Sequence, residues 1–209
     1  MEELMASEWV IRQAYATKEW MESQPFKPHY VTEVADFELD KLTQLHKANQ
    51  VIALVEKKQI KGPIQLKGKM TLCLDGIQDP GNLGTMIRSA DWFGVDQIFC
   101  STDTVEIYNP KVIQASMGSA FRVNIKYGSI ADFISTTTLP VFGALLSGTS
   151  CYESILENPG ILIIGNEGKG ISPEVAALIT HPVTIPKIGL AESLNAGVAC
   201  GILLSIWQK

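Results

Sequence analysis

The sequence predicts an α/β fold, a mostly parallel sheet with helices on both faces, within a chain of 209 residues. Two observations predict this fold. From residue 70 onward, short apolar segments alternate with segments of helical periodicity, as strands do when crossover helices join them. The predicted strands, such as MTLCLD and GILII, are apolar almost throughout rather than alternating, which indicates strands that are buried on both faces.

The expected elements fall into three parts: residues 1–60, a linker at 61–69, and a larger domain at 70–209. In the first part we expect strands at 10–17, 29–34 and 51–56, the last of them buried, with helices at 18–23 and 36–45. In the larger domain we expect strands at 70–75, 97–100, 121–125, 141–145, 160–164 and 183–185. Helices are expected there at 83–93, 110–117, 130–136, 173–179 and 194–207.

Composition excludes several classes of protein. A hydrophobic fraction of 46% with 19% charged residues excludes a disordered chain. The net charge of -5 excludes a uniformly basic surface, so any nucleic acid must be bound by a local patch. Candidates for such a patch are Arg12, Lys18, Lys57, Lys58, Lys61, Lys67, Lys69, Arg88, Lys111 and Arg122.

The four cysteines are scattered and form no CxxC motif, which argues against zinc and against disulfide bonds. The acidic start of the chain is unlike a secretory leader, and no apolar run approaches the ~20 residues that cross a bilayer. A cytoplasmic protein with no membrane partner is therefore expected.

Three loops that follow predicted strands carry unusual residues, and ligands of parallel sheets bind at such strand ends. The first loop follows Asp75 and leads through DPGN into a helix. Asn82 is placed to cap that helix, and Arg88 lies six residues further along it. Taken alone, this loop is explained as well by a purely structural interpretation, with Asn82 as a helix cap and Arg88 as an exposed charge, as by a functional one.

The second loop is the glycine-rich segment GNEGKG at 165–170. Gly165 and Gly170 have the spacing of a phosphate-binding loop, but Lys169 precedes Gly170 instead of following it, and Ile171 stands after Gly170 in place of lysine and serine or threonine, so we reject that assignment. The dinucleotide fingerprint GxGxxG is absent from the first and second loops. The three glycines instead indicate a close approach of the backbone to a ligand or to another segment.

The third loop follows Ile185 and reaches the last predicted helix through SLN at 193–195. Small residues line the start of that helix, which favours close packing against another backbone. Ser193 has the chemistry of a nucleophile, but GxSxG is absent and no histidine is suitably placed. We therefore favour a helix-capping role for Ser193.

Together, the stretches DPGNLGTMIRSADWFG, IIGNEGKGIS and IPKIGLAESLNAGVA resemble the three motifs of the SpoU/TrmH family of RNA 2′-O-ribose methyltransferases, of the SPOUT class. The order and spacing agree, and the resemblance covers residues 70–207. It implies a C-terminal trefoil knot, S-adenosylmethionine as cofactor, no metal, and a homodimer whose active site lies across the interface. The implied substrate is the ribose 2′-hydroxyl of rRNA, or of tRNA.

The resemblance also implies roles for particular residues. Arg88 would engage the 2′-hydroxyl and favour its alkoxide by its positive charge. The implied catalytic residues are Arg88, Asn82, Glu167, Ser193 and Asn195. The implied cofactor-binding residues are Leu145, Gly165, Asn166, Gly168, Ile185 and Leu194.

Residues 1–60 resemble the small RNA-binding domain of the family, which is similar to a ribosomal protein, but the opening strand and helix of that domain are absent. A truncated substrate-binding domain is therefore expected. This departure and the acidic balance leave an alternative, a non-catalytic RNA-binding or ribosome-assembly factor that keeps the fold.

Overall fold

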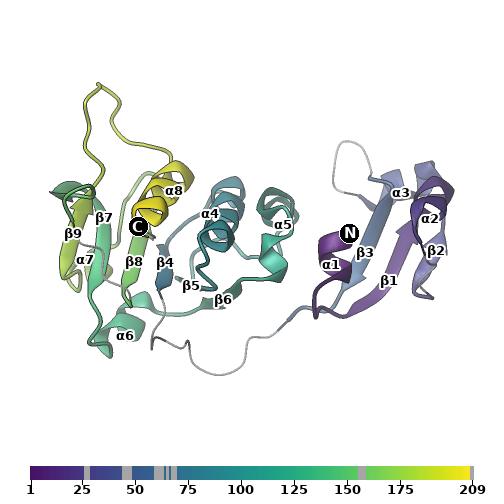
Figure 1. Ribbon diagram of the computed structural model, residues 1–209, viewed down its shortest axis with the longest axis horizontal. Coiled ribbons are helices and arrows are strands. Elements are labelled where there is room, and N and C mark those ends of the chain that lie inside the picture. The colour runs from purple at the N-terminus through teal and green to yellow at the C-terminus, as the bar shows by residue number, and fades with distance from the viewer. Residues whose placement is uncertain are drawn as a thin grey trace. The chain divides into compact units, whose positions relative to one another are not determined.

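The computed structural model describes residues 1–25, 29–43, 49–58, 64, 66, 70–154 and 159–207. The chain divides into two compact units, Met1–Gln59 and Ile60–Lys209 (Figure 1). Most of the stretch at 61–69, including its three lysines, lies outside the described residues. Each unit is described by itself below.

The larger unit contains a six-stranded sheet in the order β6-β5-β4-β8-β7-β9, and all its strand pairs are parallel. The strands are β4 (Thr71–Asp75), β5 (Gln97–Cys100), β6 (Asn124–Tyr127), β7 (Val141–Ser150), β8 (Ile161–Gly165) and β9 (His181–Thr184). The two central strands, β4 and β8, are buried almost along their whole length. The predicted parallel α/β fold is confirmed.

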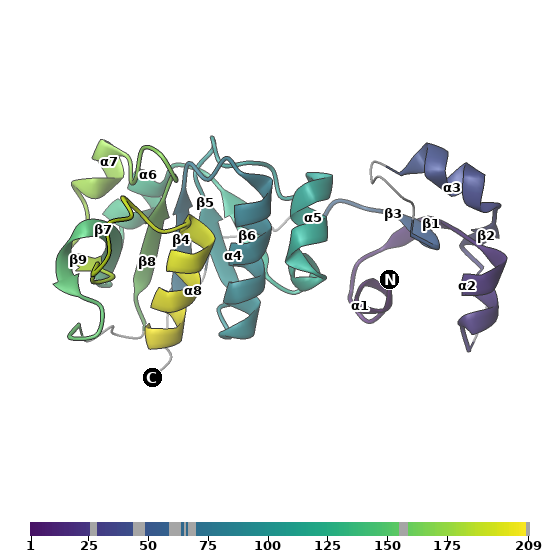
Figure 2. The ribbon, with the colours of Figure 1, turned by 90° about the horizontal axis from the view of Figure 1, so that it is seen from above.

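Helices cover both faces of this sheet (Figure 2). One face packs against α4 (Pro80–Trp92), α5 (Pro110–Ser116) and α8 (Ala196–Trp207), and the other against α6 (Ile130–Ser135) and α7 (Pro173–Ala176). Successive side chains of a strand point to opposite faces, so Leu72 and Leu74 join the first core while Cys73 joins the second. Burial on both faces explains why these strands are continuously apolar in sequence.

The start of α4 differs from the prediction. The helix begins at Pro80, three residues earlier than expected, and its N-cap is Asp79, whose Oδ1 accepts from the backbone N–H of Asn82 at 2.7 Å. Proline suits the first helical position because its missing N–H would have no partner there. The expectation that Asn82 caps the helix is therefore wrong, and its side chain remains available for other contacts.

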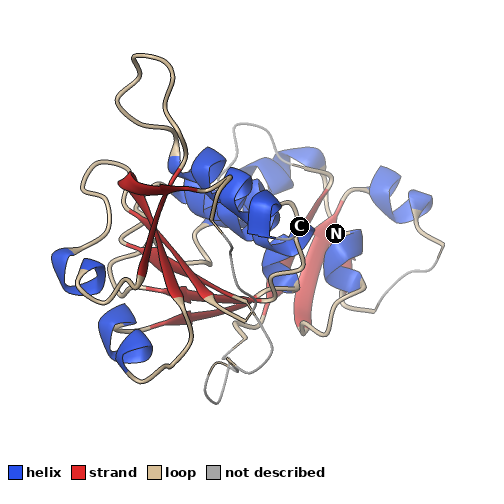
Figure 3. Cartoon of the chain, turned by 60° about the vertical axis from the view of Figure 1, so that its left-hand side comes forward, coloured by secondary structure: helices blue, strands red, loops and turns tan. Residues whose placement is uncertain are grey.

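Other boundaries shift for local reasons. The strand expected at 121–125 begins only at Asn124, because a 3-10 helix, η1 (Ser119–Phe121), occupies the start of that stretch. β7 continues beyond Leu145 to Ser150, with an irregularity in its pairing to β9 between Ala144 and Thr149. The connection from β9 to α8 projects away from the sheet (Figure 3). Among the described residues, no helix is long and apolar enough to cross a membrane.

The smaller unit is a three-stranded sheet in the order β2-β1-β3 with three short helices. Strand β1 (Ile11–Ala16) runs parallel to β2 (Val31–Glu33) and antiparallel to β3 (Val51–Val55). The helices are α1 (Glu2–Met5), α2 (Lys18–Ser23) and α3 (Asp36–Leu42). The prediction that 51–56 is a buried strand is wrong, because β3 lies at an edge of this sheet and its Leu54 is 55% exposed.

Close packing of α4 on α5 predicts the effect of adding a single methyl group. A Cβ at Gly84 would lie 2.5 Å from Ala115 Cβ and 2.8 Å from the Val112 carbonyl oxygen. We expect Gly84→Ala to destabilise the fold by about 1–3 kcal/mol, the usual cost of overpacking. Gly201→Ala is the control, since a Cβ there meets only Ser89 Oγ at 3.8 Å, and it should stabilise α8 by about 0.5–1 kcal/mol. Urea unfolding followed by circular dichroism measures both, and equal effects of the two variants would contradict this account.

Candidate functional site

The first and second loops leave the sheet side by side. β4 and β8 are parallel neighbours, and their last residues, Asp75 and Gly165, are register partners. The Asp75 carboxylate also accepts a hydrogen bond from the backbone N–H of Ser172 at 2.7 Å, which ties the far end of the second loop to β4. Because both strands end at the same edge, the segments that follow them meet there.

Three expected site residues from three separate segments form one hydrogen-bonded chain at this edge. The Nδ2 group of Asn82 donates to Glu167 Oε1 at 2.7 Å. The Nδ2 group of Asn195 donates to Asn82 Oδ1 at 2.8 Å. The structure thus brings together the polar residues of all three loops, although they are 85 and 113 positions apart in the sequence.

The donor-to-acceptor direction of these hydrogen bonds is set by α8. Asn195 Oδ1 accepts from the backbone N–H of Val198 at 3.2 Å, in the first turn of the helix, so its Nδ2 must face Asn82. Asn82 then presents its oxygen to Asn195 and its N–H to Glu167, which acts as the acceptor at the end of the chain. Asn195 is the residue that caps α8, so the predicted capping role of Ser193 is wrong. Ser193 is exposed and forms no hydrogen bond with a described residue.

Arg88 lies apart from the hydrogen-bonded side chains of Glu167, Asn82 and Asn195. It is on α4, six residues beyond Asn82, which is about 9 Å along the helix axis. Its side chain is exposed and forms no hydrogen bond or ion pair with any residue that the structure describes. Within one copy of the chain, the structure therefore does not bring Arg88 to Asn82 and Glu167.

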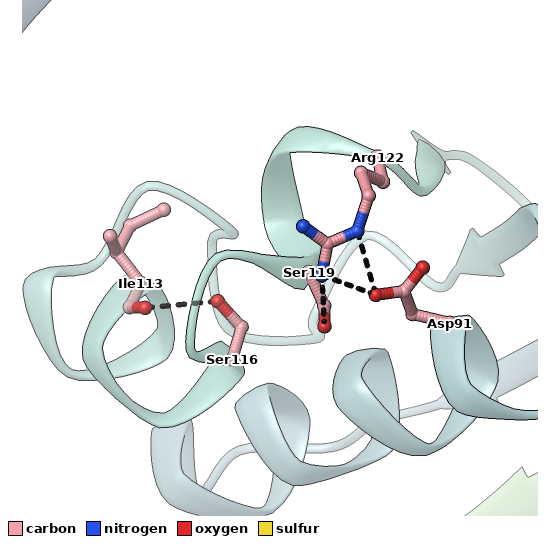
Figure 4. A network of polar contacts seen from close by, with 5 residues as sticks. All are labelled: Asp91, Ile113, Ser116, Ser119 and Arg122. Atoms are coloured by element: carbon pink, nitrogen blue, oxygen red, sulfur yellow. Dashed lines mark hydrogen bonds and ion pairs between the residues drawn. The ribbon is translucent and has the colours of Figure 1, made fainter. Parts of the chain in front are cut away.

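The nearest acidic residue along α4 from Arg88, Asp91, is bound by another arginine (Figure 4). Arg122 donates to Asp91 Oδ2 from Nε at 2.9 Å and from Nη2 at 2.6 Å. Partial burial raises the pKa of Asp91, but hydrogen bonds from Arg122 and Ser119 outweigh burial, and the net pKa is lowered. Arg122 thus neutralises the acid that stands one turn from Arg88.

Ion pairs reduce the predicted basic patch in the same way. Arg12 pairs with Glu56, Lys18 with Glu22, and Arg122 with Asp91. Among the other predicted basic residues, Arg88 and Lys111 form no ion pair within the described part of the chain. The available positive charge is therefore smaller than the sequence suggested.

The expected cofactor residues come from four segments of the larger unit: β7, the end of β8 with the loop after it, the segment after β9, and the residues before α8. Ile185 is partly buried against the core beneath α4, α5 and α8, and Leu145 against the core beneath α6 and α7. Leu194 is half exposed. Gly165 has no room for a side chain, since a Cβ there would collide with the backbone of Gly170 and Ile171. Of the two explanations that the sequence left open for the glycines of the second loop, the structure shows at Gly165 the close approach of another backbone segment.

Other chemistries find no support among the described residues. They contain no group of three His, Cys, Asp or Glu side chains that would hold a metal ion. The four cysteines, Cys73, Cys100, Cys151 and Cys200, are buried, and burial raises the pKa of each thiol, which disfavours the reactive thiolate.

The sequence analysis missed one supporting residue, Ser101, at the carboxyl end of β5. Its Oγ accepts from the backbone N–H of Gly76 at 2.7 Å and donates to Asp103 Oδ1 at 2.6 Å. The signal in the sequence was the polar run STDT directly after an apolar strand. Ser101 fixes the start of the first loop.

A parallel α/β protein with polar side chains from three loops gathered at one strand edge has the usual layout of a binding or catalytic site. The SpoU rRNA Methylase family matches residues 69–205, which is more than half of the chain. The chain therefore belongs to the SpoU rRNA Methylase family, and the resemblance found in the sequence is confirmed.

Individual proteins agree with this assignment. The 23S rRNA (guanosine(2553)-2′-O)-methyltransferase RlmP of Bacillus subtilis is 34% identical over 140 residues, covering 65% of this chain and 56% of that protein. A protein of Porphyromonas gingivalis, described as an RNA methyltransferase of the TrmH family, has a TM-score of 0.87 and 37% identity, covering 98% of this chain and 84% of its own. An AdoMet-bound rRNA methyltransferase of Sinorhizobium meliloti has a TM-score of 0.86 and 27% identity, covering 100% of this chain and 84% of its own.

The double role of Asn195 predicts different effects for two substitutions. Asn195→Ala removes the cap of α8 and should cost about 1 kcal/mol of stability. Asn195→Asp keeps an oxygen acceptor for the Val198 N–H and should leave stability within about 0.5 kcal/mol of the unmodified chain, although Asn82 then faces an acceptor on both sides. Urea unfolding of both variants checks this, and an Asp variant as unstable as the Ala variant would refute the capping role.

Proposed function

We propose that this chain is an S-adenosylmethionine-dependent methyltransferase that modifies a ribose 2′-hydroxyl of rRNA. The observation that carries the proposal is the hydrogen-bonded chain Glu167–Asn82–Asn195, which joins the three motifs typical of the family. The rRNA methyltransferases among its relatives support rRNA over tRNA as the substrate. Because all three of these side chains are present and hydrogen-bonded, we favour an enzyme over the alternative of a non-catalytic assembly factor.

Residues in and after the strands are proposed to hold the cofactor. Leu145, Ile185 and Leu194 would contact the adenine and the methionine chain, and the loop at 165–168, with Asn166 and Gly168, would border them. When bound, S-adenosylmethionine supplies a methyl group made electrophilic by its sulfonium. No metal is required for this chemistry.

Arg88 is proposed to act on the nucleophile. To accept the methyl group that S-adenosylmethionine would supply, the ribose hydroxyl must lose its proton, which would pass to water. An alkoxide character develops on that oxygen, which the guanidinium of Arg88 stabilises electrostatically. Because Arg88 has no partner among the described residues, its charge remains available for this role. Asn82, Glu167, Ser193 and Asn195 would orient the reacting groups.

The separation of Arg88 from Asn82 supports a homodimer in which one subunit supplies Arg88 to the site of the other. Trp92, on the same helix, is 81% exposed, and Val198 on α8 is 51% exposed. Apolar side chains of this size, exposed on neighbouring helices, are suited to burial against a second copy. The dimer interface is proposed to include α4 and α8.

Two further features of the family, and a location in the cytoplasm, are proposed for this chain. The segment between β9 and α8 would be part of a trefoil knot, which is supported by the similarity to TrmH-type structures over nearly the whole chain. The unit Met1–Gln59 would bind RNA as a ribosomal-protein-like domain. The buried, unpaired cysteines suit the reducing environment of the cytoplasm.

Arg88 provides a direct test of the activity. Arg88→Ala should lower kcat for methyl transfer to a 23S rRNA transcript by at least about 100-fold, the usual effect of removing a charge-stabilising group. Binding of S-adenosylmethionine, measured by calorimetry, should be nearly unchanged. Arg88→Lys keeps the charge and should retain part of the rate. Full activity in the Ala variant would refute the proposed mechanism, and failure of the unmodified chain to bind S-adenosylmethionine would favour the assembly factor.

The proposed dimer predicts a defined response to surface charge. Analytical ultracentrifugation at micromolar concentration should show a dimer, and Val198→Asp should shift it towards the 22.8 kDa monomer. Leu54→Asp, on the exposed edge strand of the smaller unit, is the matched control and should leave the dimer intact. A monomer in the unmodified protein would contradict a shared site.

A further inference from the structure

The loop that carries Glu167 is closed by one side chain. Residues 166–170 form a tight turn in which Asn166 and Gly170 exchange two backbone hydrogen bonds of 2.9 Å. Inside the turn, Asn166 Oδ1 accepts from the backbone N–H groups of Gly168 and Lys169, each at 2.9 Å. The Asn166 side chain therefore fixes the backbone on both sides of Glu167.

The same side chain also reaches the first loop. Asn166 Nδ2 donates to the carbonyl oxygen of Gly76 at 2.6 Å, across 90 positions of sequence. Gly76 has a φ of +71°, a conformation that favours glycine, and its N–H is held by Ser101 Oγ. The Gly76 residue is thus held at both its N–H and its C=O, at the start of the connection that leads to Asn82.

These contacts use nearly all the hydrogen-bonding capacity of the Asn166 amide. A side-chain amide offers two N–H donors and two acceptor lone pairs. Both lone pairs and one N–H of Asn166 are bound to backbone groups, which leaves a single N–H. A direct polar contact with a ligand is therefore a minor part of what this side chain can do.

We propose that Asn166 is a positioning residue, which ties the loop of Glu167 to the loop of Asn82 and so maintains the hydrogen bond between those two side chains. This inference rests on the proposed function and replaces the expected cofactor contact of the Asn166 side chain. Asn166 acts through Glu167, whereas Asn82 and Glu167 are themselves proposed to orient the reacting groups.

Two substitutions separate the two tasks of Asn166. Asn166→Asp keeps the acceptor for Gly168 and Lys169 but replaces the donor to Gly76 with a repelling oxygen. Asn166→Ala loses both. If the link between the loops is what matters, both variants should lower kcat for the 23S rRNA transcript by about tenfold or more, as small misplacements of reacting groups do.

Their Kd for S-adenosylmethionine should stay within about threefold, because the chemical step and not cofactor binding is affected. The matched control is Asn124→Asp, which makes the same change in charge at the opposite edge of the sheet.

A spectroscopic measurement tests the link without any turnover. The side-chain amide signal of Asn82, identified by its loss in Asn82→Ala, should shift in Asn166→Asp, since its hydrogen bond to Glu167 is then no longer maintained. Backbone amide exchange at Gly168 and Lys169 should stay slow in the Asp variant and become fast in the Ala variant.

The outcomes are distinct. An unchanged kcat and an unchanged Asn82 signal in Asn166→Asp would overturn the positioning role. A Kd raised by about tenfold or more with kcat unchanged would also overturn it and restore a cofactor contact. If the unmodified chain methylates neither rRNA nor tRNA, the proposed function fails, and the Asn82 signal still decides the positioning role.

Discussion

The parallel pairing of β4 with β8 is the constraint on which the rest of the structure depends. The two strands are separated by about 90 residues in sequence, yet Asp75 and Gly165 end in register at one edge of the sheet. Both strands are buried by helices on the two faces, so hydrophobic burial fixes the position of their ends. The strands therefore fix where the loops of Asn82 and Glu167 begin.

Polar contacts then convert the position of the backbone into a defined direction of hydrogen bonding. The N-terminus of α8 requires an acceptor, Asn195 supplies its oxygen, and the remaining amide group must donate to Asn82. A helix end with unsatisfied N–H groups thus determines which way two side-chain amides face. The site is oriented by the backbone of α8 rather than by the side chains alone.

Much of the larger unit was predictable, because its strands are continuous apolar segments and its helices have clear periodicity. The parallel sheet and the involvement of Asn82, Glu167 and Asn195 were expected. The caps were not, since Asn82 and Ser193 are equally good capping residue types within three positions of Asp79 and Asn195, and only three-dimensional contacts distinguish them. The lack of an ion-pair partner for Arg88 among the described residues was not visible in the sequence, because it depends on which arginine binds Asp91. β3 was misjudged because an apolar composition does not reveal that a strand lies at an edge.

The capping of α8 by Asn195 links the site to the fraying of a helix end. Whenever the first turn of α8 opens, Asn195 loses its anchor and the chain to Glu167 is broken, while the sheet and its cores remain folded. A cap of ~1 kcal/mol alters the balance between closed and open turns only about fivefold. The integrity of the site therefore depends on the first turn of α8 staying closed, and not only on the global stability of the domain.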